Sequence, residues 1–226
     1  MLGRVTGVDV WWATIAQQRP EHLDLLGDAE RERWERFRRD EDRARFVLGV
    51  ALLRLAVAGT LGVSVADVTI DRTCATCGQP HGRPRLPGDE LHVSVSHSGD
   101  WIAVALTAVA PVGVDVEQVR AIDIAGMAKL VLAPDERADS LADFYALWAR
   151  KESAVKATGD GLRVPLNAVV VAPDGRITGY PDRPDLTATT VDLLPRPGYA
   201  AALTVLAVSP PVVHEQDAAP LLTPLR

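Results

Sequence analysis

Residues 112–118 read VGVDVEQ. Valine occupies every second position, which is the period of a β-strand, because successive side chains of a strand point to opposite faces. The valines then share one face, and the carboxylates of Asp115 and Glu117 share the other, about 7 Å apart along the strand. Like charges in this position repel each other. The pattern therefore indicates either an exposed acidic face or a site that receives a positive charge.

The residues before this heptapeptide predict a half-domain of their own. Alternating β-branched and aromatic residues predict strands at 3–14 and 66–73, and a pair of strands within 91–108 that turns at residues 98–100. Residues 28–62 have the apolar spacing of helices, with Asp28 as the N-cap and a break near residues 39–40 that divides them into two helices.

The residues after it predict a second half-domain of similar make-up. Residues 122–138 are helical in character, and a stronger helix begins at Ser140, where Asp143 completes a capping-box pattern, and ends at Gly159 and Gly161. Strands are expected at 167–172, 175–180, 187–193 and 199–208. Helices followed by antiparallel strands, seen twice, predict an α+β fold of two similar half-domains.

Length and composition set the predicted boundaries. The chain has 226 residues, 47% of them apolar and 24% charged, which is enough for a hydrophobic core. We expect an N-terminal half at 1–110, a C-terminal half at 111–210 and a loosely ordered, proline-containing tail at 211–226. The net charge of −6 argues against a nucleic-acid binder that depends on attraction to phosphates.

Localisation signals are lacking in the sequence. It contains no run of 18 apolar residues that would predict a transmembrane helix, and its N-terminus lacks the basic, apolar and small-residue segments of a signal peptide. We therefore expect a cytoplasmic protein that binds neither membrane nor nucleic acid.

Glu152 lies at the edge of the apolar stripe of the helix that begins at Ser140, and Lys156 follows one turn later on the same side. A Glu–Lys pair at this spacing is common on exposed helices, where it contributes only about 0.2–0.5 kcal/mol. With Asp115 and Glu117, however, Glu152 makes a set of three carboxylates, and Mg²⁺ binds carboxylate oxygens together with water and substrate phosphates. Lys156 would then hold a phosphate as a point charge, an arrangement that suits phosphoryl transfer.

Groups that can contact a phosphate occur in the first half. Ser96 and His97 come at the end of an expected strand, where a hydroxyl, an imidazole and turn amides can bind an anion. Arg83 lies between Gly82 and Pro84 in a loop. A hydrogen-bonded turn and a solvated arginine are the plainer interpretations of these two segments taken singly.

Cys74 and Cys77 form a CxxC pattern in the segment CATCGQPHGRP. Two thiolates fall short of the four ligands of a structural zinc ion, and His81 can add a third. A reduced pair in a turn is the simpler interpretation. The flanking glycine and proline residues do not provide the strand–CxxC–helix context of a redox dithiol.

The sequence lacks the motifs of several other chemistries. It has no GxSxG nucleophile elbow, no GxxxxGK[ST] phosphate loop and no HExxH zinc motif. His97 beside serines does not by itself make a catalytic triad.

Four segments carry a resemblance to a known family, and they occur in its order and at its spacing. They are HGRP (81–84), VSVSHSGDWIAVAL (93–106), VGVDVE (112–117) and FYALWARKESAVKATGDGL (144–162). On these motifs the chain resembles the Sfp-type 4′-phosphopantetheinyl transferases over about residues 5–208. Residues 37–54 also resemble the family's N-terminal helix pair. The combination of GVDVE with WxRKESxxK is far more specific than either motif alone.

The resemblance implies a fold and a reaction. The family has two similar α+β halves related by a pseudo-twofold within one monomer, and coenzyme A binds between them. Its members transfer 4′-phosphopantetheine from coenzyme A to a serine hydroxyl of an apo carrier protein, whether acyl, peptidyl or aryl, and release 3′,5′-ADP. The Sfp type activates nonribosomal peptide and polyketide synthases of secondary metabolism. Mg²⁺ is the expected metal, and Mn²⁺ accepts the same carboxylate ligands.

The resemblance also implies site residues. Asp115, Glu117 and Glu152 match the metal ligands, Glu152 is the favoured general base, directly or through a water, and Lys156 matches the lysine that stabilises charge on the pyrophosphate. The implied coenzyme A contacts are Arg33, Arg45, Arg83, Ser96, His97 and Lys156.

Other functions stay open at this point. They are a coenzyme A- or nucleotide-binding module without turnover, a metal-dependent phosphohydrolase that cleaves a pyrophosphate, and a protein that only mediates interactions. The presence of all three carboxylates together with Lys156 counts against the first of these.

Overall fold

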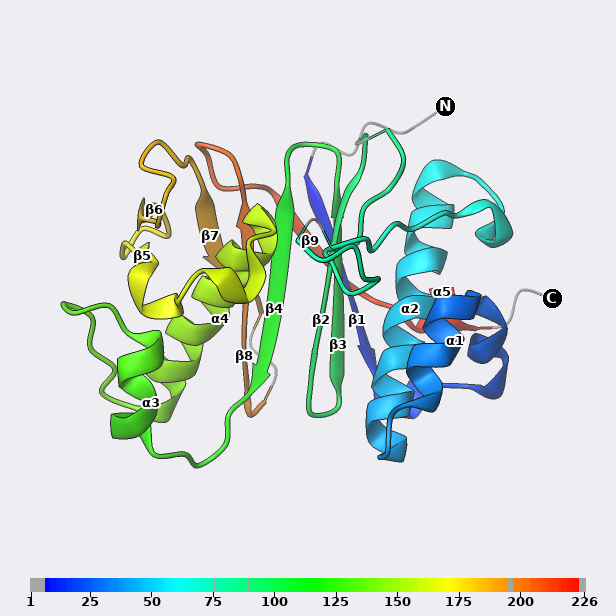
Figure 1. Cartoon of the computed structure of the whole chain (residues 1–226), viewed down its shortest axis with the longest axis horizontal. Coiled ribbons are helices and arrows are strands. Elements are labelled where there is room, and N and C mark those ends of the chain that lie inside the picture. Colours follow the sequence, from blue (N-terminus) through cyan, green and yellow to red (C-terminus); the bar gives the residue numbers. More distant parts are fainter. Residues whose placement is uncertain (1–6, 75, 89, 195–196, 224–226) are drawn as a thin grey trace. The chain divides into compact units, whose positions relative to one another are not determined.

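The computed structural model describes residues 7–74, 76–88, 90–194 and 197–223. The chain forms two compact units, one of Met1–Val109 together with Val213–Arg226, the other of Ala110–Val212. Each unit packs helices against its own sheet (Figure 1), so the predicted α+β class is confirmed.

The first unit is built on a four-stranded sheet of order β2-β3-β1-β9. Its strands pair antiparallel except β1 and β9, which run parallel. Its strands and helices are β1 (Val8–Thr14), α1 (Asp28–Glu35), α2 (Asp40–Leu61), β2 (His92–Ser98), β3 (Trp101–Thr107), β9 (Val213–Asp217) and α5 (Ala219–Leu222), with 3-10 turns at Ile15–Gln17, Pro20–Leu25 and Val65–Asp67. The predicted break between two helices near residues 39–40 is confirmed. Residues 3–6 of the first predicted strand lie outside the described residues.

Helix α2 is the core helix of the first unit. Its residues Leu48, Leu52 and Leu53 are fully buried in a cluster with Ile102 and Val104 of β3. By length and hydropathy this helix also meets the criteria for a membrane span, with 56% of its most apolar window buried inside the protein. The described contacts are those of a helix packed on a sheet, in which an apolar helix face is removed from water.

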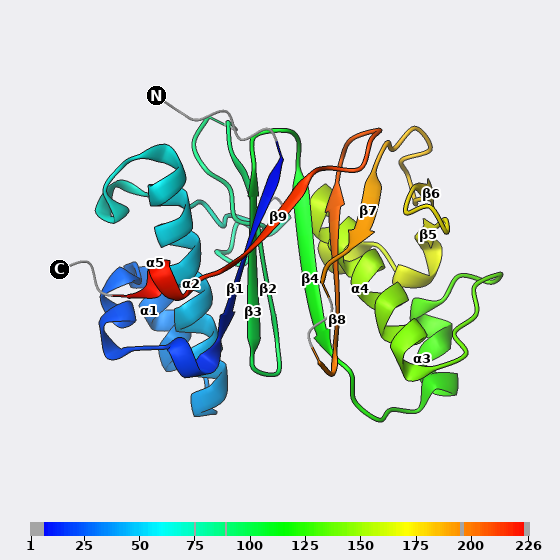
Figure 2. The same cartoon turned by 180° about the vertical axis from the view of Figure 1, so that it is seen from behind.

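The tail does not have the loose order that we expected. Strand β9 pairs in parallel with β1, for example Val10 with Glu215, and so forms one edge of the sheet (Figure 2). Trp12 of β1 donates a hydrogen bond from its indole Nε1 to Glu215 at 2.7 Å. Ala218 and Leu222 are buried in the core cluster around α2. Paired backbone and buried apolar side chains stabilise a segment whose prolines alone indicated irregular structure.

The prediction of a strand at 66–73 is also wrong. Only Asp71 pairs there, in an isolated bridge with Arg85. Val68 instead turns its side chain into the α2 core, while its carbonyl accepts a hydrogen bond from Arg54 at 2.7 Å. An arginine of α2 thus provides the backbone partner that a neighbouring strand would have provided.

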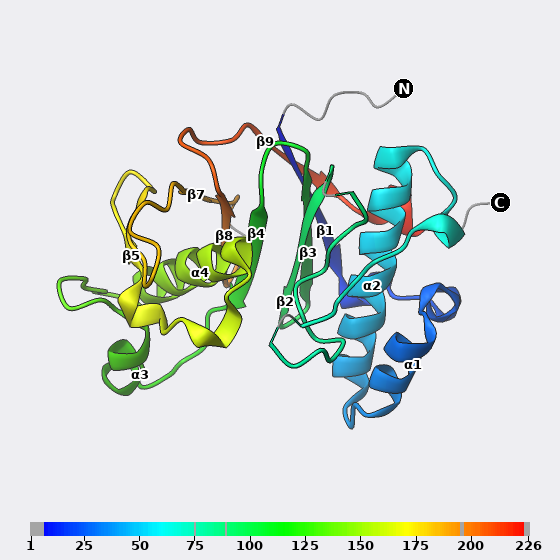
Figure 3. The same cartoon turned by 45° about the horizontal axis from the view of Figure 1, so that its top comes forward.

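The second unit has a three-stranded antiparallel sheet of order β4-β8-β7 and a small β5-β6 pair. Its elements are β4 (Val112–Gln118), α3 (Ile124–Val131), α4 (Leu141–Thr158), β5 (Val170–Val171), β6 (Ile177–Gly179), β7 (Thr189–Asp192) and β8 (Tyr199–Val205), with 3-10 turns at Gly161–Arg163 and Leu166–Ala168. Helix α4 lies along the β4-β8 face (Figure 3). Each of the four strands expected after α4 is present within its predicted range. Helix α3 is shorter than predicted, since it ends before Pro134, which has no N–H to continue a helix.

The ends of α4 follow the sequence signals. The Ser140 side chain accepts a hydrogen bond from the Asp143 amide at 3.1 Å, which caps the first turn. Gly159 ends the helix with a φ of 78°, a conformation that glycine adopts without a side-chain clash. Between these ends Phe144 and Trp148 face an apolar cluster that also contains residues of α3. The helix is therefore fixed at both ends and along its length.

Candidate active site

The site begins with the close approach of α4 to β4, and Gly113 makes that approach possible. A Cβ atom built on Gly113 would lie 1.9 Å from the carbonyl oxygen of Ser153 and 2.5 Å from the amide nitrogen of Ala157. No side chain fits in that space, since real Cβ contacts are essentially never shorter than 3.0 Å. Because Gly113, Asp115 and Glu117 alternate along one strand, the two carboxylates share the strand face that packs on α4.

Asp115 and Lys156 form the ion pair of this contact. Asp115 is only 2% exposed, and its Oδ1 accepts a hydrogen bond from Lys156 Nζ at 2.5 Å. The lysine side chain keeps 30% of its surface exposed. A buried carboxylate is therefore neutralised by a cation that still reaches solvent, which limits the desolvation penalty of the pair.

Glu152 lies one helical turn before Lys156 and also faces Asp115. Burial raises the pKa of the Glu152 carboxyl above its ordinary value, and the negative charge of Asp115 raises it further. Lys156 and a hydrogen bond from the Trp148 side chain lower this pKa and offset part of the rise. The electrostatic coupling means that the two carboxylates are close enough to repel each other.

Trp148 has an aromatic support of its own. Its ring stacks on Tyr145, with centroids 5.7 Å apart and an interplanar angle of 2°, and meets Phe144 edge-on at 5.7 Å. Rings packed in these geometries restrict one another. The hydrogen bond that orients Glu152 is consequently made by a side chain that is itself held in place.

The donor set fits a hard divalent cation. Asp115, Glu117 and Glu152 offer carboxylate oxygens, which Mg²⁺ prefers, and the one lysine leaves a net formal charge of about −2 on the four groups. All four of these predicted site residues belong to β4 and α4 of the second unit, and the structure brings Asp115, Glu152 and Lys156 together. Glu117 lies two residues after Asp115 on the same strand face and is half-buried.

Lys151 is a charged residue whose place the sequence pattern did not predict. It is fully buried, donates hydrogen bonds to the carbonyls of Val131 at 2.7 Å and Leu166 at 3.3 Å, and forms an ion pair with Glu136. Burial lowers its pKa, and Glu136 offsets part of that shift. Lys151 therefore ties the segments before and after α4 to the helix. The available signal was its place within the apolar stripe of α4, where a surface lysine would not occur.

Hydroxyl groups line the same helix–sheet contact deeper in the unit. Ser153 and Thr204 lie 2.7 Å apart through their side-chain oxygens, and Thr204 and Thr190 are also 2.7 Å apart. The Ser153 hydroxyl lies 2.7 Å from the Arg150 carbonyl, to which it donates. These buried polar groups satisfy one another, which is the condition for keeping them out of water.

The predicted coenzyme A contacts of the first unit come from α1, α2, β2 and a loop. Arg45 of α2 donates from Nε to the Gly99 carbonyl at 2.5 Å and pairs with Asp42 at 2.6 Å. Gly99, with a φ of 53°, turns the hairpin that follows Ser96 and His97. The structure thus brings Arg45 to the end of β2, where Ser96 is buried and His97 is exposed.

Arg33 and Arg83 lie on other elements of this unit. The Arg33 guanidinium of α1 sits over the Phe46 ring, 5.2 Å from its centroid, next to Arg45 along the chain. Arg83 belongs to the loop before β2 and follows Gly82, whose amide donates to the Arg72 carbonyl at 2.7 Å.

Arg72 is a basic residue that the sequence motifs did not single out. Burial lowers the pKa of its guanidinium, and the charges of Arg33 and Arg54 lower it further, while Glu30 opposes them. Glu30 also pairs with Arg54 at 3.0 Å. Three arginines around one carboxylate give this part of the first unit an excess of positive charge, which favours an anionic ligand.

Comparisons with known proteins identify the family of the chain. The family model described as the 4′-phosphopantetheinyl transferase superfamily matches residues 111–204, and the model of the 4′-phosphopantetheinyl transferase N-terminal region matches residues 10–109. One match covers most of the first unit without β9 and α5, and the other covers the second unit into β8.

Curated relatives carry the same description. A 4′-phosphopantetheinyl transferase of Bacillus subtilis is 34% identical over 77% of this chain and 80% of its own length. The 4′-phosphopantetheinyl transferase Sfp of Bacillus subtilis strain 168 is 30% identical over 73% of this chain and 75% of its own length. HetI, from a Nostoc species, is 31% identical over 69% and 70%.

Proposed function

Because the chain belongs to the 4′-phosphopantetheinyl transferase superfamily and is an enzyme of that activity, we propose that it modifies apo carrier proteins in a metal-dependent reaction. A serine hydroxyl of the carrier attacks the phosphorus that bears pantetheine in coenzyme A. The new P–O bond to serine forms as the pyrophosphate bond breaks, and 3′,5′-ADP leaves with the electron pair of that bond.

Asp115, Glu117 and Glu152 would hold one Mg²⁺, and Mn²⁺ accepts the same oxygen ligands. When bound, this ion supplies positive charge to the phosphate oxygens. The single observation that carries the proposal is the buried carboxylate of Asp115, which faces Glu152 of α4 across the close contact that Gly113 permits. A divalent cation would offset the like charges of these two carboxylates.

Glu152 takes the proton of the attacking serine, directly or through a water. Burial and the charge of Asp115 raise the pKa of Glu152 in the metal-free site, and a bound cation would lower it, which favours the ionised carboxylate that can accept a proton. Lys156 has a partly exposed side chain and steadies the charge that develops on the pyrophosphate. In this proposal Lys156 exchanges its carboxylate partner for a phosphate oxygen.

The first unit contributes the contacts to coenzyme A. Arg45 lies at the hairpin that carries Ser96 and His97, and Arg33 lies in the arginine-rich region around Glu30. Their charges suit the phosphates of a nucleotide. Arg83 is assigned to the same ligand on its place in the HGRP motif.

The carrier domains of nonribosomal peptide and polyketide synthases are the proposed protein substrates. The relatives named above are described as transferases without their targets, so this proposal rests on the Sfp-type motifs. We further propose that the enzyme acts as a cytoplasmic monomer, which size-exclusion chromatography with light scattering tests in part.

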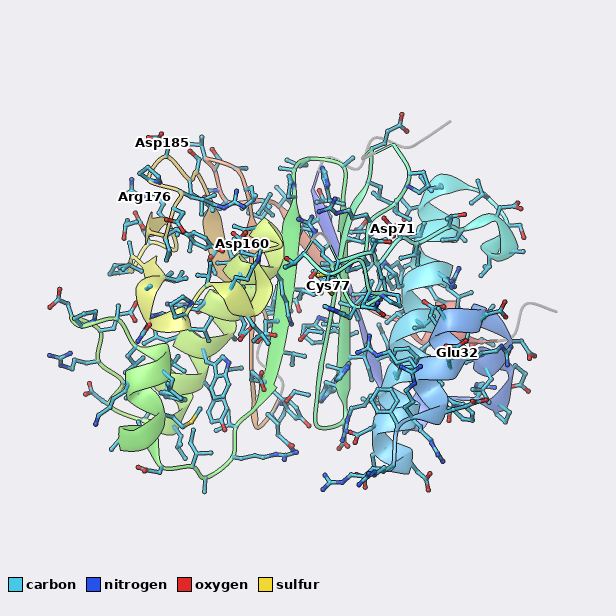
Figure 4. All side chains as sticks on the ribbon, viewed as in Figure 1. Glu32, Asp71, Cys77, Asp160, Arg176 and Asp185 are labelled. Carbon is cyan, nitrogen blue, oxygen red and sulfur yellow. The ribbon has the colours of Figure 1, made fainter. Side chains whose placement is uncertain are left out.

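Intact-protein mass spectrometry of an apo carrier domain tests the reaction. With the enzyme, coenzyme A and Mg²⁺, we expect the carrier to gain the mass of one phosphopantetheine, and a chelator to abolish the gain. Substitution Glu152→Gln should lower the rate by about 10²–10⁴-fold, the usual contribution of general acid–base catalysis. Glu32→Gln is the matched control, because Glu32 is exposed on α1 and pairs only weakly with Arg36 at 3.7 Å (Figure 4).

Several outcomes would contradict the proposal. Unchanged modification of the carrier in the presence of a chelator would show that the reaction does not depend on a metal. An unchanged rate of the Glu152→Gln variant would show that Glu152 is not the general base. Coenzyme A that binds without any gain in carrier mass would indicate a binding module without turnover. Release of 3′,5′-ADP without a carrier would indicate a phosphohydrolase.

A further inference from the structure

The loop between Asp71 and Arg85 brings two thiols and an imidazole together. One ligand atom from each of Cys74, Cys77 and His81 lies within 4.8 Å of the others, and Cys77 Sγ is 3.0 Å from His81 Nε2. Neither cysteine is in a disulfide. Cys77 is exposed and is labelled in Figure 4. The reaction proposed above uses none of the three residues.

The backbone around Cys74 has a turn that presents both thiols on one side. The Gly78 amide donates to the Cys74 carbonyl at 2.9 Å, and the Cys74 amide donates to the Gln79 carbonyl at 2.8 Å. Gly78 has a φ of 71°, which glycine adopts freely.

The base of the loop is fixed to the rest of the first unit. Asp71 and Arg85 exchange backbone hydrogen bonds of 2.9 and 2.8 Å. Gly82 packs so closely that a Cβ atom on it would lie 2.9 Å from the Thr73 carbonyl. His81 therefore lies in a loop whose two ends are held together by backbone pairing. This restraint reduces the conformational entropy that the loop loses when it binds a ligand.

We propose that Cys74, Cys77 and His81 bind one Zn²⁺, with water as the fourth ligand. Thiolate and imidazole ligands suit zinc and are poor ligands for Mg²⁺, so this site is chemically distinct from the carboxylates of the second unit. Two ligands of a tetrahedral zinc ion at about 2.3 Å for sulfur and 2.0–2.1 Å for nitrogen lie roughly 3.6 Å apart. The 3.0 Å between Cys77 and His81 has to widen by only about 0.6 Å, less than an ordinary side-chain adjustment.

The bound ion acts as a structural clip. It closes a loop that is rich in glycine and proline and that contains little regular structure. His81 lies two residues before Arg83, so the ion restrains the backbone next to that arginine without touching a substrate. Binding of zinc to the folded loop stabilises it by mass action.

The test uses the full chain, purified in zinc-containing buffer and then passed over a chelating resin that removes weakly bound metal. We expect one equivalent of zinc per chain by elemental analysis. Replacement by Co²⁺ should give an intense thiolate-to-cobalt charge-transfer band, which oxygen ligands alone do not produce. Both thiols should react with a thiol reagent slowly in the zinc-loaded protein and rapidly once the metal is removed.

Three substitutions locate the ion. Cys74→Ser and Cys77→Ser should each lower the zinc affinity by at least about 100-fold, since loss of even a supporting residue costs 10–100-fold. His81→Gln should also weaken binding and leave the charge-transfer band in place, because both sulfurs remain. His214→Gln is the matched control, as His214 is exposed on β9, and it should bind zinc like the unaltered chain.

The remaining outcomes overturn the proposal. Zinc retained equally by the serine variants would belong to another site. A chain without zinc whose thiols both react freely would have only a reduced pair in a turn. A chain without zinc whose thiols are oxidised to a Cys74–Cys77 disulfide would have a redox pair instead.

Discussion

Each unit rests one long helix on its sheet, yet the two helix–sheet contacts differ in chemistry. In the first unit, Leu48, Leu52 and Leu53 of α2 are buried in an apolar cluster with residues of β3. In the second unit, the buried residues of α4 include Lys151 and Ser153, and its edge carries the pair of Lys156 with Asp115. A long helix packed on a sheet therefore forms an apolar core in the first unit and the candidate active site in the second.

The contrast separates what builds the fold from what performs chemistry. Apolar burial contributes about 25 cal/mol per Å² and needs no partner, whereas every buried charge needs one. Among the described buried side chains, the second unit includes a charged lysine and aspartate, whereas the polar ones of the first unit are His22 and three hydroxyls. Departures of this kind from the rules of stability are expected at functional sites.

The largest effect is expected from Lys151→Met. The substitution keeps the length of the side chain but leaves Glu136 in a mostly buried position without its partner, and breaking such a pair costs about 3–5 kcal/mol. Leu52→Met on α2 is the matched change in the apolar contact, and we expect it to cost less than about 1.5 kcal/mol. Free energies of unfolding from urea titrations measure both. Equal losses of unfolding free energy in the two variants would contradict the difference between a charged interior in the second unit and an apolar one in the first.

The next effect is expected from Gly113→Ala. Its methyl group would meet the Ser153 carbonyl at 1.9 Å, so α4 has to move away from β4, and we expect a loss of about 3 kcal/mol, the upper end for overpacked sites. The same movement draws Lys156 away from Asp115 and should lower the transfer rate as well.

Gly49→Ala on α2 is the control for that substitution. A Cβ atom on Gly49 lies 3.5 Å from Val95 and 4.0 Å from Ile102, which is ordinary contact. Alanine is favoured over glycine inside a helix by about 0.5–1 kcal/mol, so this variant should be as stable as the unaltered chain or more stable. Melting temperatures report the direction of both changes, and a stable Gly113→Ala variant would contradict the close approach.

The smallest effect concerns pH and Tyr180 of the second unit. Burial raises the pKa of Tyr180 to about 12 from an ordinary value of 10.0. The phenol lies 2.6 Å from the Thr158 hydroxyl and donates to Asp160 at 3.0 Å (Figure 4 labels Asp160). Because the folded state holds the proton more tightly, its contribution to stability is complete below pH 10 and is lost as the pH rises toward 12.

Tyr180→Phe removes that titration. We expect the variant to be less stable than the unaltered chain by about 1 kcal/mol at neutral pH, because its hydrogen bonds are lost. Between pH 10 and 12 the free energy of unfolding of the variant should fall by about 2 kcal/mol less than that of the unaltered chain. Urea titrations across that range measure the difference. The curve of Leu52→Met should run parallel to that of the unaltered chain, and a parallel curve for Tyr180→Phe would contradict the prediction.

Local sequence signals predicted the elements that carry the site. The alternation in VGVDVEQ placed Asp115 and Glu117 on one strand face, and helical spacing placed Glu152 and Lys156 on one side of α4. The pairing of Lys156 with Asp115 could not be predicted from spacing, because it depends on the distance between helix and strand. That distance follows from Gly113, whose role becomes visible only when α4 is in place.

Long-range pairing accounts for the errors. The chain from residue 211 has few local signals, but its backbone pairs with β1, a strand roughly two hundred residues away along the chain. Residues 66–73 mislead in the opposite way. Their alternation of apolar and polar residues is strong, but the segment packs on helix α2 instead of pairing with a strand. The ion pair of Lys151 with Glu136 lies across a connection between two helices, which no periodicity describes.

The parallel pairing of β9 with β1 has a consequence for synthesis of the protein. On the ribosome, β1, β2 and β3 emerge first, the entire second unit follows, and the edge strand of the first sheet emerges last. At roughly 5–20 residues per second, the first sheet waits about 5–20 seconds with the side of β1 that receives β9 open. An open strand is a template for pairing with other chains, so nascent molecules would be most prone to misassembly in that interval. The emergence of β9 then completes the sheet whose other strands were made first.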